Sequence, residues 1–75
     1  MSPSQSQLPL ISGAKLVRAL ERDGWVQAGT RGSHVKLRKG TERVVVPLHK
    51  ELRRGTLAGI LAEIGMSPQE LRDLL

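Results

Sequence analysis

The strongest constraint on the fold is the strict alternation of apolar and basic residues from His34 to Arg38. Val35 and Leu37 share one face of an extended chain, whereas His34, Lys36 and Arg38 share the other. Short runs typical of strands lie on both sides of this segment, at residues 25–28 and 43–46. Glycine-containing turns at residues 29–32 and 39–42 join the three runs. The pattern predicts a three-stranded antiparallel sheet with one face free to meet water.

One amphipathic helix is predicted before this sheet. Ser12 is a plausible N-cap, with Ile11 before it and Leu16 four residues after it placed to pack as a hydrophobic staple. Gly24 is expected to end the helix in the left-handed conformation that its missing Cβ permits. The expected apolar stripe consists of Ala14, Leu16, Val17 and Leu20.

Two further helices are predicted after the sheet. The first is expected to start at a cap formed by Gly55 or Thr56 and to end at Gly65. Ser67 and Glu70 have the spacing of a capping box, which predicts a short final helix. The apolar stripe of the first of these helices consists of Leu57, Ile60, Leu61 and Ile64.

The order of these elements predicts an α+β fold in two layers, with the helices on one face of the sheet. A chain of 75 residues has room for one small domain, which we expect over residues 10–75. Residues 1–9 are polar, contain two prolines and lack any period, so they predict a disordered tail. Trp25 is the only aromatic residue. We expect it in the core, which leaves little scope for recognising RNA bases by stacking.

The positive charge is concentrated in the middle of the chain. The formal net charge is +5. Residues 31–54 contain eight basic and two acidic residues, a net charge of +6, whereas the rest contains four basic and five acidic residues, a net charge of −1. Clustering of this kind favours a polyanionic partner, nucleic acid first, over a surface that is merely solvated.

The composition also limits the chemistry and the compartment. There is no cysteine, so a disulfide framework and a thiolate metal site are both excluded. Neither a membrane-spanning run nor the regions of a signal peptide are visible, and we expect a cytoplasmic protein. Two histidines and scattered acids such as Glu42 and Glu51 match no spacing typical of zinc sites or two-metal nucleases. We therefore expect no metal and no cofactor.

His34 is the candidate catalytic residue. Its imidazole is expected to project from the open side of the sheet among cationic neighbours, and an imidazole can take up or release a proton near neutral pH. Cations that hold a phosphate beside such a ring create the arrangement for acid–base attack on an RNA backbone. The simpler alternative is a surface histidine that contacts phosphate passively.

Basic residues on two segments are the candidate RNA contacts. Lys50, Arg53 and Arg54 precede a predicted helix, whose N-terminal N–H groups favour an anion; the alternative is an ordinary solvated loop. His49 lies in the same loop, either as a second proton-transfer group near His34 or, as we favour here, as a residue that only orders the loop. The full set of expected RNA-binding residues is Arg31, Ser33, Lys36, Arg38, Lys50, Arg53 and Arg54.

Several short motifs, in this order and at this spacing, resemble the HicA family of toxin–antitoxin toxins. The resemblance runs from Ser12 to about Leu75. Its pieces are Gly24-Trp25, Gly32-Ser33-His34, Val46-Pro47-Leu48-His49, Lys50-Glu51-Leu52, Gly55-Thr56-Leu57, Ile60-Leu61 and Ile64-Gly65-Met66.

The resemblance implies a fold like that of double-stranded-RNA-binding domains, an mRNA endonuclease activity independent of the ribosome, and neutralisation by a HicB antitoxin. It also implies that the histidine of the Gly-Ser-His element, His34, is catalytic. The working hypothesis is therefore a metal-independent endoribonuclease toxin. Its rivals are a module of the same fold that binds RNA without cutting it, and a domain whose basic surface mainly complements an acidic protein.

Overall fold

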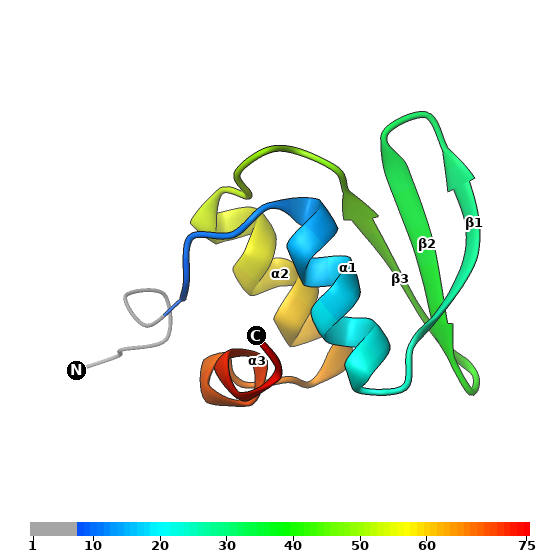
Figure 1. Ribbon diagram of the computed structural model, residues 1–75. Coiled ribbons are helices and arrows are strands. Elements are labelled where there is room, and N and C mark those ends of the chain that lie inside the picture. The colour runs from blue at the N-terminus through cyan, green and yellow to red at the C-terminus, as the bar shows by residue number, and fades with distance from the viewer. Residues whose placement is uncertain (1–7) are drawn as a thin grey trace.

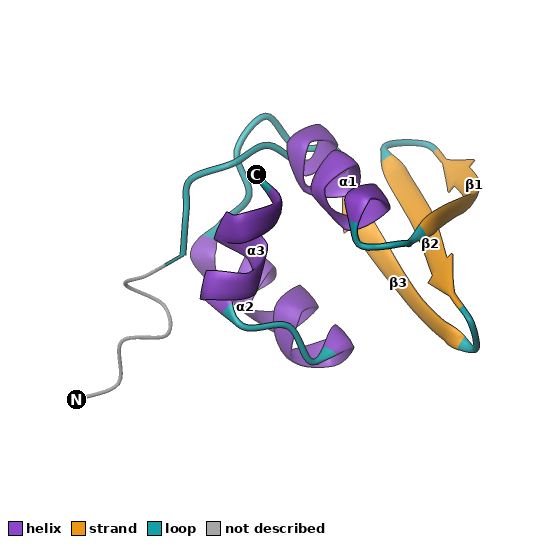
Figure 2. Cartoon of the chain, turned by 60° about the horizontal axis from the view of Figure 1, so that its bottom comes forward, coloured by secondary structure: helices purple, strands orange, loops and turns teal. Residues whose placement is uncertain are grey.

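The computed structural model describes residues 8–75. Helix α1 (Gly13–Arg22) precedes the strands β1 (Val26–Arg31), β2 (His34–Lys39) and β3 (Glu42–Pro47), and α2 (Arg54–Ile64) and α3 (Pro68–Leu74) follow them. The three strands form one antiparallel sheet in the order β1-β2-β3. Helices α1 and α2 pack on the same side of the sheet against β3, and α3 packs against α1 (Figures 1 and 2). This arrangement confirms the predicted α+β class and is consistent with a double-stranded-RNA-binding-domain-like fold.

The first hairpin differs from its prediction. The sequence pattern predicted a turn over residues 29–32, which is wrong, because β1 continues to Arg31 and only Gly32 and Ser33 form the turn. A bulge between Gln27 and Gly29 shifts the register of β1 by one residue and lets Gly29, at φ 147°, stay within the strand. Gly32 has a φ of 60°, the positive value that a two-residue hairpin turn requires at its first central position.

The N-terminal helix begins and ends where predicted, but its buried face is rotated slightly. The Ser12 Oγ accepts a hydrogen bond from the Lys15 N–H at 3.1 Å, and Gly24 follows the helix with a φ of 100°. Leu16, Val17 and Leu20 are buried as expected. Ala14 is exposed instead, and Gly13 and Ala19 are buried in its place.

The C-terminal helices confirm two of the three predicted caps. Gly65 ends α2 in the left-handed conformation, and Ser67 and Glu70 form both hydrogen bonds of the capping box. The start of α2 was predicted wrongly. The helix begins at Arg54 after the N-cap Arg53, which makes no side-chain capping bond.

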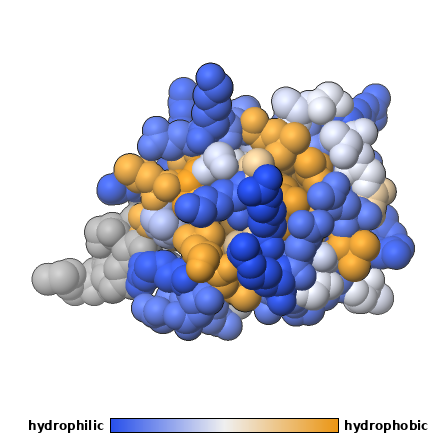
Figure 3. All heavy atoms as spheres, viewed as in Figure 1, coloured by the Kyte–Doolittle hydropathy of each residue, from blue (hydrophilic) through white to orange (hydrophobic). Residues whose placement is uncertain are grey.

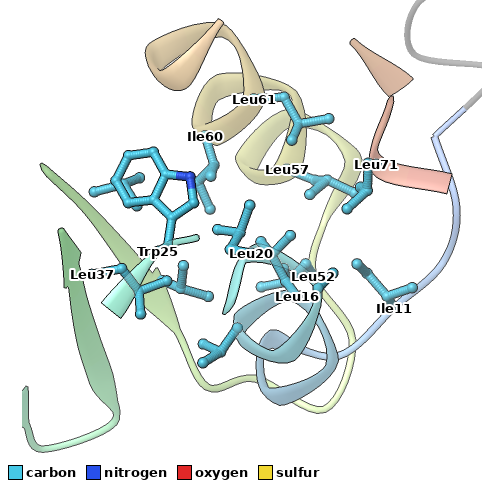
Figure 4. Close-up of a cluster of buried hydrophobic side chains, with 14 of the residues drawn as sticks. Ile11, Leu16, Leu20, Trp25, Leu37, Leu52, Leu57, Ile60, Leu61 and Leu71 are labelled. Carbon is cyan, nitrogen blue, oxygen red and sulfur yellow. The ribbon is translucent and has the colours of Figure 1, made fainter. Parts of the chain in front are cut away.

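The hydrophobic core lies between the helices and the covered face of the sheet. Figure 4 shows Trp25 in the same cluster as Leu37 of β2 and Ile60 of α2, and Trp25 is 4% exposed, so its predicted place in the core is confirmed. Leu8 is also buried in this cluster, so the packed chain begins two residues before Leu10, where order was expected to start. The rest of the predicted disordered tail, residues 1–7, lies outside the described residues.

The surface is mixed in character. Figure 3 shows hydrophobic residues reaching the surface in patches between hydrophilic side chains. Within residues 8–75, no polar or charged side chain is buried. None of the helices in this part of the chain has the length and apolar character needed to cross a membrane.

The segment between β3 and α2, residues 48–53, is fixed by main-chain hydrogen bonds, and we call it the connecting segment. The Gly13 N–H donates to the His49 carbonyl at 2.9 Å, and the Leu52 N–H donates to the Ile11 carbonyl at 2.8 Å. At this contact Gly13 approaches the backbone of Pro47 and Leu48 so closely that a Cβ would collide with the Pro47 carbonyl. A residue without a side chain is therefore required where α1 meets the connecting segment.

Replacing Gly13 by alanine should destabilise the fold. The added methyl group must displace main-chain atoms, so we expect a loss of about 2 kcal/mol, or a fall of roughly 10 °C in melting temperature for a domain of this size. Gly59→Ala is the matched control, because Gly59 lies within α2 and a Cβ added there would meet no atom within 4 Å. It should melt at the same temperature or higher, since alanine favours a helix over glycine by up to about 1 kcal/mol. Equal thermal stability of Gly13→Ala and the wild type, measured by circular dichroism, would contradict the close contact.

Candidate nucleic-acid interface

The register of the sheet places His34 between Arg31 of β1 and Pro47 of β3. Residues directly opposite in antiparallel strands project from the same face of the sheet. Val35 and Leu37, which alternate with His34 along β2, are 4% and 1% exposed against the helices. His34 is exposed on the face that the helices leave uncovered, so its predicted placement is confirmed.

Four basic residues share this open face with His34. Lys36 and Arg38 follow it along β2, and all of these side chains are exposed. The remaining open-face positions of the ladder are occupied by glycine, valine or proline, so no carboxylate stands among them. We call the set the basic sheet face; it consists of Arg31, His34, Lys36, Arg38 and Arg43.

Arg43 is the member that the sequence reasoning missed. In the sequence, Arg43 was only one of the eight basic residues counted in the net charge of residues 31–54. In the sheet it lies directly opposite Arg38. Two like charges at opposed positions destabilise a sheet, so this pairing has no structural benefit of its own. The signal that could have found Arg43 is the short Gly40–Thr41 turn, which fixes the register of the second hairpin.

The side chains of the basic sheet face have no charge partner among residues 8–75. None of its five side chains makes a hydrogen bond or ion pair with another of residues 8–75. Other basic side chains do have such partners: Lys39 pairs with Asp23 at 3.2 Å, and Arg22 donates to the Leu74 carbonyl at 2.8 Å. An exposed cation without an internal partner is available to an external anion such as phosphate.

A shallow hollow of about 400 Å³ lies on the same face of the sheet. Its lining includes Lys36, Arg38 and Arg43 together with the small apolar residues Ala28 and Val45. Val45 is 45% exposed and nearby Val26 is 60% exposed. The face therefore combines a cationic surface with a weakly apolar floor.

Ser33 connects the hairpin turn next to His34 with the connecting segment. Its carbonyl accepts a hydrogen bond from the Leu48 N–H at 2.6 Å. His49, the next residue, is exposed, and its carbonyl accepts the bond from the Gly13 N–H. Its imidazole makes no hydrogen bond within residues 8–75. Main-chain hydrogen bonds, and not this side chain, therefore order the segment.

The remaining predicted RNA contacts are exposed but stand apart from the basic sheet face. Lys50 lies in the connecting segment, and Arg53 and Arg54 lie at the start of α2. Figures 1 and 2 show this segment passing the N-terminal end of α1, so that α2 begins on the far side of α1 from β1 and β2. The structure thus places Arg31 and Ser33 next to His34, with Lys36 and Arg38 farther along the same face, and it keeps Arg53 and Arg54 as a separate basic cluster.

The arrangement offers an exposed imidazole beside phosphate-binding cations. Among the residues that the structure describes, no group of three or more His, Asp and Glu side chains is placed to hold a metal ion. The chemistry that these side chains can supply is proton transfer at the imidazole and charge stabilisation by the neighbouring cations.

Comparison with models of known protein families identifies a match. The family model described as HicA toxin of bacterial toxin-antitoxin matches residues 13–66. The matched stretch is well over half of the chain and contains α1, the whole sheet, the connecting segment and α2. No curated protein gives a significant match to the chain.

Proposed function

This chain belongs to the HicA toxin family of bacterial toxin–antitoxin systems, and we propose that it is a metal-independent mRNA endoribonuclease with His34 as its catalytic residue. By cleaving mRNA it blocks translation in the cytoplasm, and a HicB-like antitoxin neutralises it. The observation that carries the proposal is the position of His34, exposed and directly beside Arg31 on a sheet face without carboxylates.

The proposed reaction begins with proton removal from a ribose 2′-OH by His34. The resulting 2′ oxygen attacks the adjacent phosphorus, and the products are a 2′,3′-cyclic phosphate and a 5′-OH. Lys36, Arg38 and Arg31 stabilise the negative charge that builds on the phosphate oxygens. DNA resists because it lacks the attacking hydroxyl.

RNA binding is proposed to use both basic clusters. Around the reacting phosphate, Ser33 joins Arg31, Lys36 and Arg38. Arg43, opposite Arg38, supports a contact to a neighbouring phosphate farther along the basic sheet face. Arg53 and Arg54 hold a more distant part of the strand on the other side of α1, and Lys50 of the connecting segment binds the strand between the two clusters. We expect the antitoxin to cover His34 or to block the approach to it.

One observation favours the rival function, a module that binds RNA without cutting it. A catalytic base is commonly oriented by a hydrogen bond from a third group, and the His34 imidazole has no such partner within residues 8–75. In that case the basic sheet face binds phosphates without taking part in a reaction.

Incubation with labelled single-stranded RNA in EDTA separates the two functions. Cleavage supports the nuclease, and a salt-sensitive shift of intact RNA supports the binder.

Substituting His34 by glutamine should abolish most of the cleavage. Loss of a general base costs about 10²-fold to 10⁴-fold in rate, while the exposed position predicts an unchanged melting temperature and nearly unchanged RNA affinity. The measurement is the rate of cleavage of a labelled RNA by the purified variant, with the DNA of the same sequence as a negative control. A folded His34→Gln protein that still cleaves RNA and arrests growth would show that the assignment is wrong.

Arg43→Gln should weaken RNA binding without weakening the fold. The substitution removes one phosphate contact, so the slope of log affinity against log salt should fall by about one. It also removes the like charge opposite Arg38, so the melting temperature should stay the same or rise. Arg18→Gln is the matched control, since Arg18 is exposed on α1, behind the sheet. The same change in salt slope for both variants would mean that binding depends on net charge and not on the basic sheet face.

A further inference from the structure

The proposed reaction needs a second proton-transfer group. When the bond from phosphorus to the 5′ oxygen breaks, the departing oxygen must receive a proton, and a positioned acid accelerates this step. Arginine does not release its proton in proteins, which excludes Arg31, Arg38 and Arg43. Among the remaining groups near the His34 end of the sheet, an imidazole is the best suited to give a proton near neutral pH.

We propose that the imidazole of His49 is the general acid that protonates the 5′ oxygen of the leaving nucleotide. The inference rests on the proposed function and assigns a second catalytic residue to it. It also replaces the loop-ordering role that the sequence favoured for His49.

The position of His49 relative to His34 is set by two features of the backbone. Pro47 stands directly opposite His34 in the ladder, and the Leu48 N–H is bound to the carbonyl of Ser33. Opposed Cα atoms in such a ladder are about 5 Å apart, and two residues of chain add at most about 8 Å. The Cα atoms of the two histidines therefore lie within about 13 Å of each other at the same end of the sheet, a separation that two imidazoles with one phosphate between them can span.

The local structure leaves the imidazole of His49 free for this role. The hydrogen bonds that order the connecting segment here are made by main-chain atoms, including the His49 carbonyl. The side chain is exposed and has no hydrogen-bond partner within residues 8–75. Because the backbone at His49 is fixed and no internal hydrogen bond of the imidazole has to be broken, contact with a substrate costs only the rotational freedom of this one side chain.

The step balances in atoms and protons. The bond from the 2′ oxygen to phosphorus forms as the bond from phosphorus to the 5′ oxygen breaks. The 2′-OH proton goes to neutral His34, and the proton of the His49 imidazolium goes to the 5′ oxygen. Exchange with water restores both histidines to their starting states, so no further reactant is needed.

The test is to replace the leaving oxygen by sulfur. An RNA oligonucleotide that carries a 5′-bridging sulfur at the cleavage site mapped with the wild type has a leaving group that needs no protonation. For His49→Gln we expect a loss of about 10²-fold on the ordinary RNA and a rate close to that of the wild type on the sulfur-containing RNA. Equal losses on the two substrates would overturn the proposal, because a positioning or structural role does not depend on the leaving atom.

Two further variants separate this result from failure of the proposed function. His34→Gln should be slow on both RNAs, since the attacking hydroxyl must still lose its proton; full activity of that variant overturns the proposed function itself. Lys50→Gln is the matched control, because Lys50 is the exposed neighbour of His49 and its loss removes a charge but no imidazole. Sulfur-dependent rescue of Lys50→Gln instead of His49→Gln would assign the acid to the lysine and overturn the inference. We expect His49→Gln to melt at the same temperature as the wild type, because the main-chain carbonyl at this position, which accepts the Gly13 N–H bond, is present whatever the side chain.

Discussion

The contact between the start of α1 and the connecting segment is the constraint on which the rest of this small structure depends. The helix layer and the sheet are joined there by main-chain hydrogen bonds from Gly13 and Leu52, and the close packing leaves no room for a Cβ at Gly13. The next bond, from Leu48 to Ser33, fixes the same segment to the first hairpin turn. One short stretch of chain therefore holds α1, α2 and the His34 end of the sheet in a single arrangement.

Because of this constraint, the residues that stabilise the fold and the residues of the candidate site lie on different faces of the sheet. The apolar residues of the strands pack under the helices, where no polar or charged side chain among residues 8–75 is buried. The open face contributes little to the core and instead carries cations that have no partner among the residues that the structure describes. Arg38 and Arg43, placed opposite each other, cost some stability through repulsion. A face that accepts such a cost is better explained by an external anion than by folding.

The sequence predicted the fold well where a local rule decides the outcome. Alternation alone put Val35 and Leu37 inside and His34 outside, and the capping box at Ser67 needs only residues three apart. It failed where the deciding contact is distant or the backbone is irregular. The bulge before Gly29 keeps β1 extended past a glycine that otherwise signals a turn, and no pattern along the chain reveals it. Helix α2 starts at Arg54 although Gly55 and Thr56 are the better capping residues; the Leu52 N–H just before it is bound to the distant Ile11 carbonyl, a contact that the local pattern does not reveal.

In the candidate site, too, the features that follow from a local rule were predicted and those that depend on distant contacts were missed. His34 and its neighbours on β2 followed from the period of one strand, whereas Arg43 required the register between two strands. The separation of Arg53 and Arg54 from His34 required the path of the connecting segment around α1. A site laid out on an open sheet face has no enclosing pocket to exclude water or orient the substrate. Under the proposed function, the site gains its specificity from the RNA bound along it, and a partner that covers His34 also covers the neighbouring cations Arg31 and Lys36. Inhibition by an acidic partner would then need neither a deep groove nor a change of fold, only a surface of matching charge.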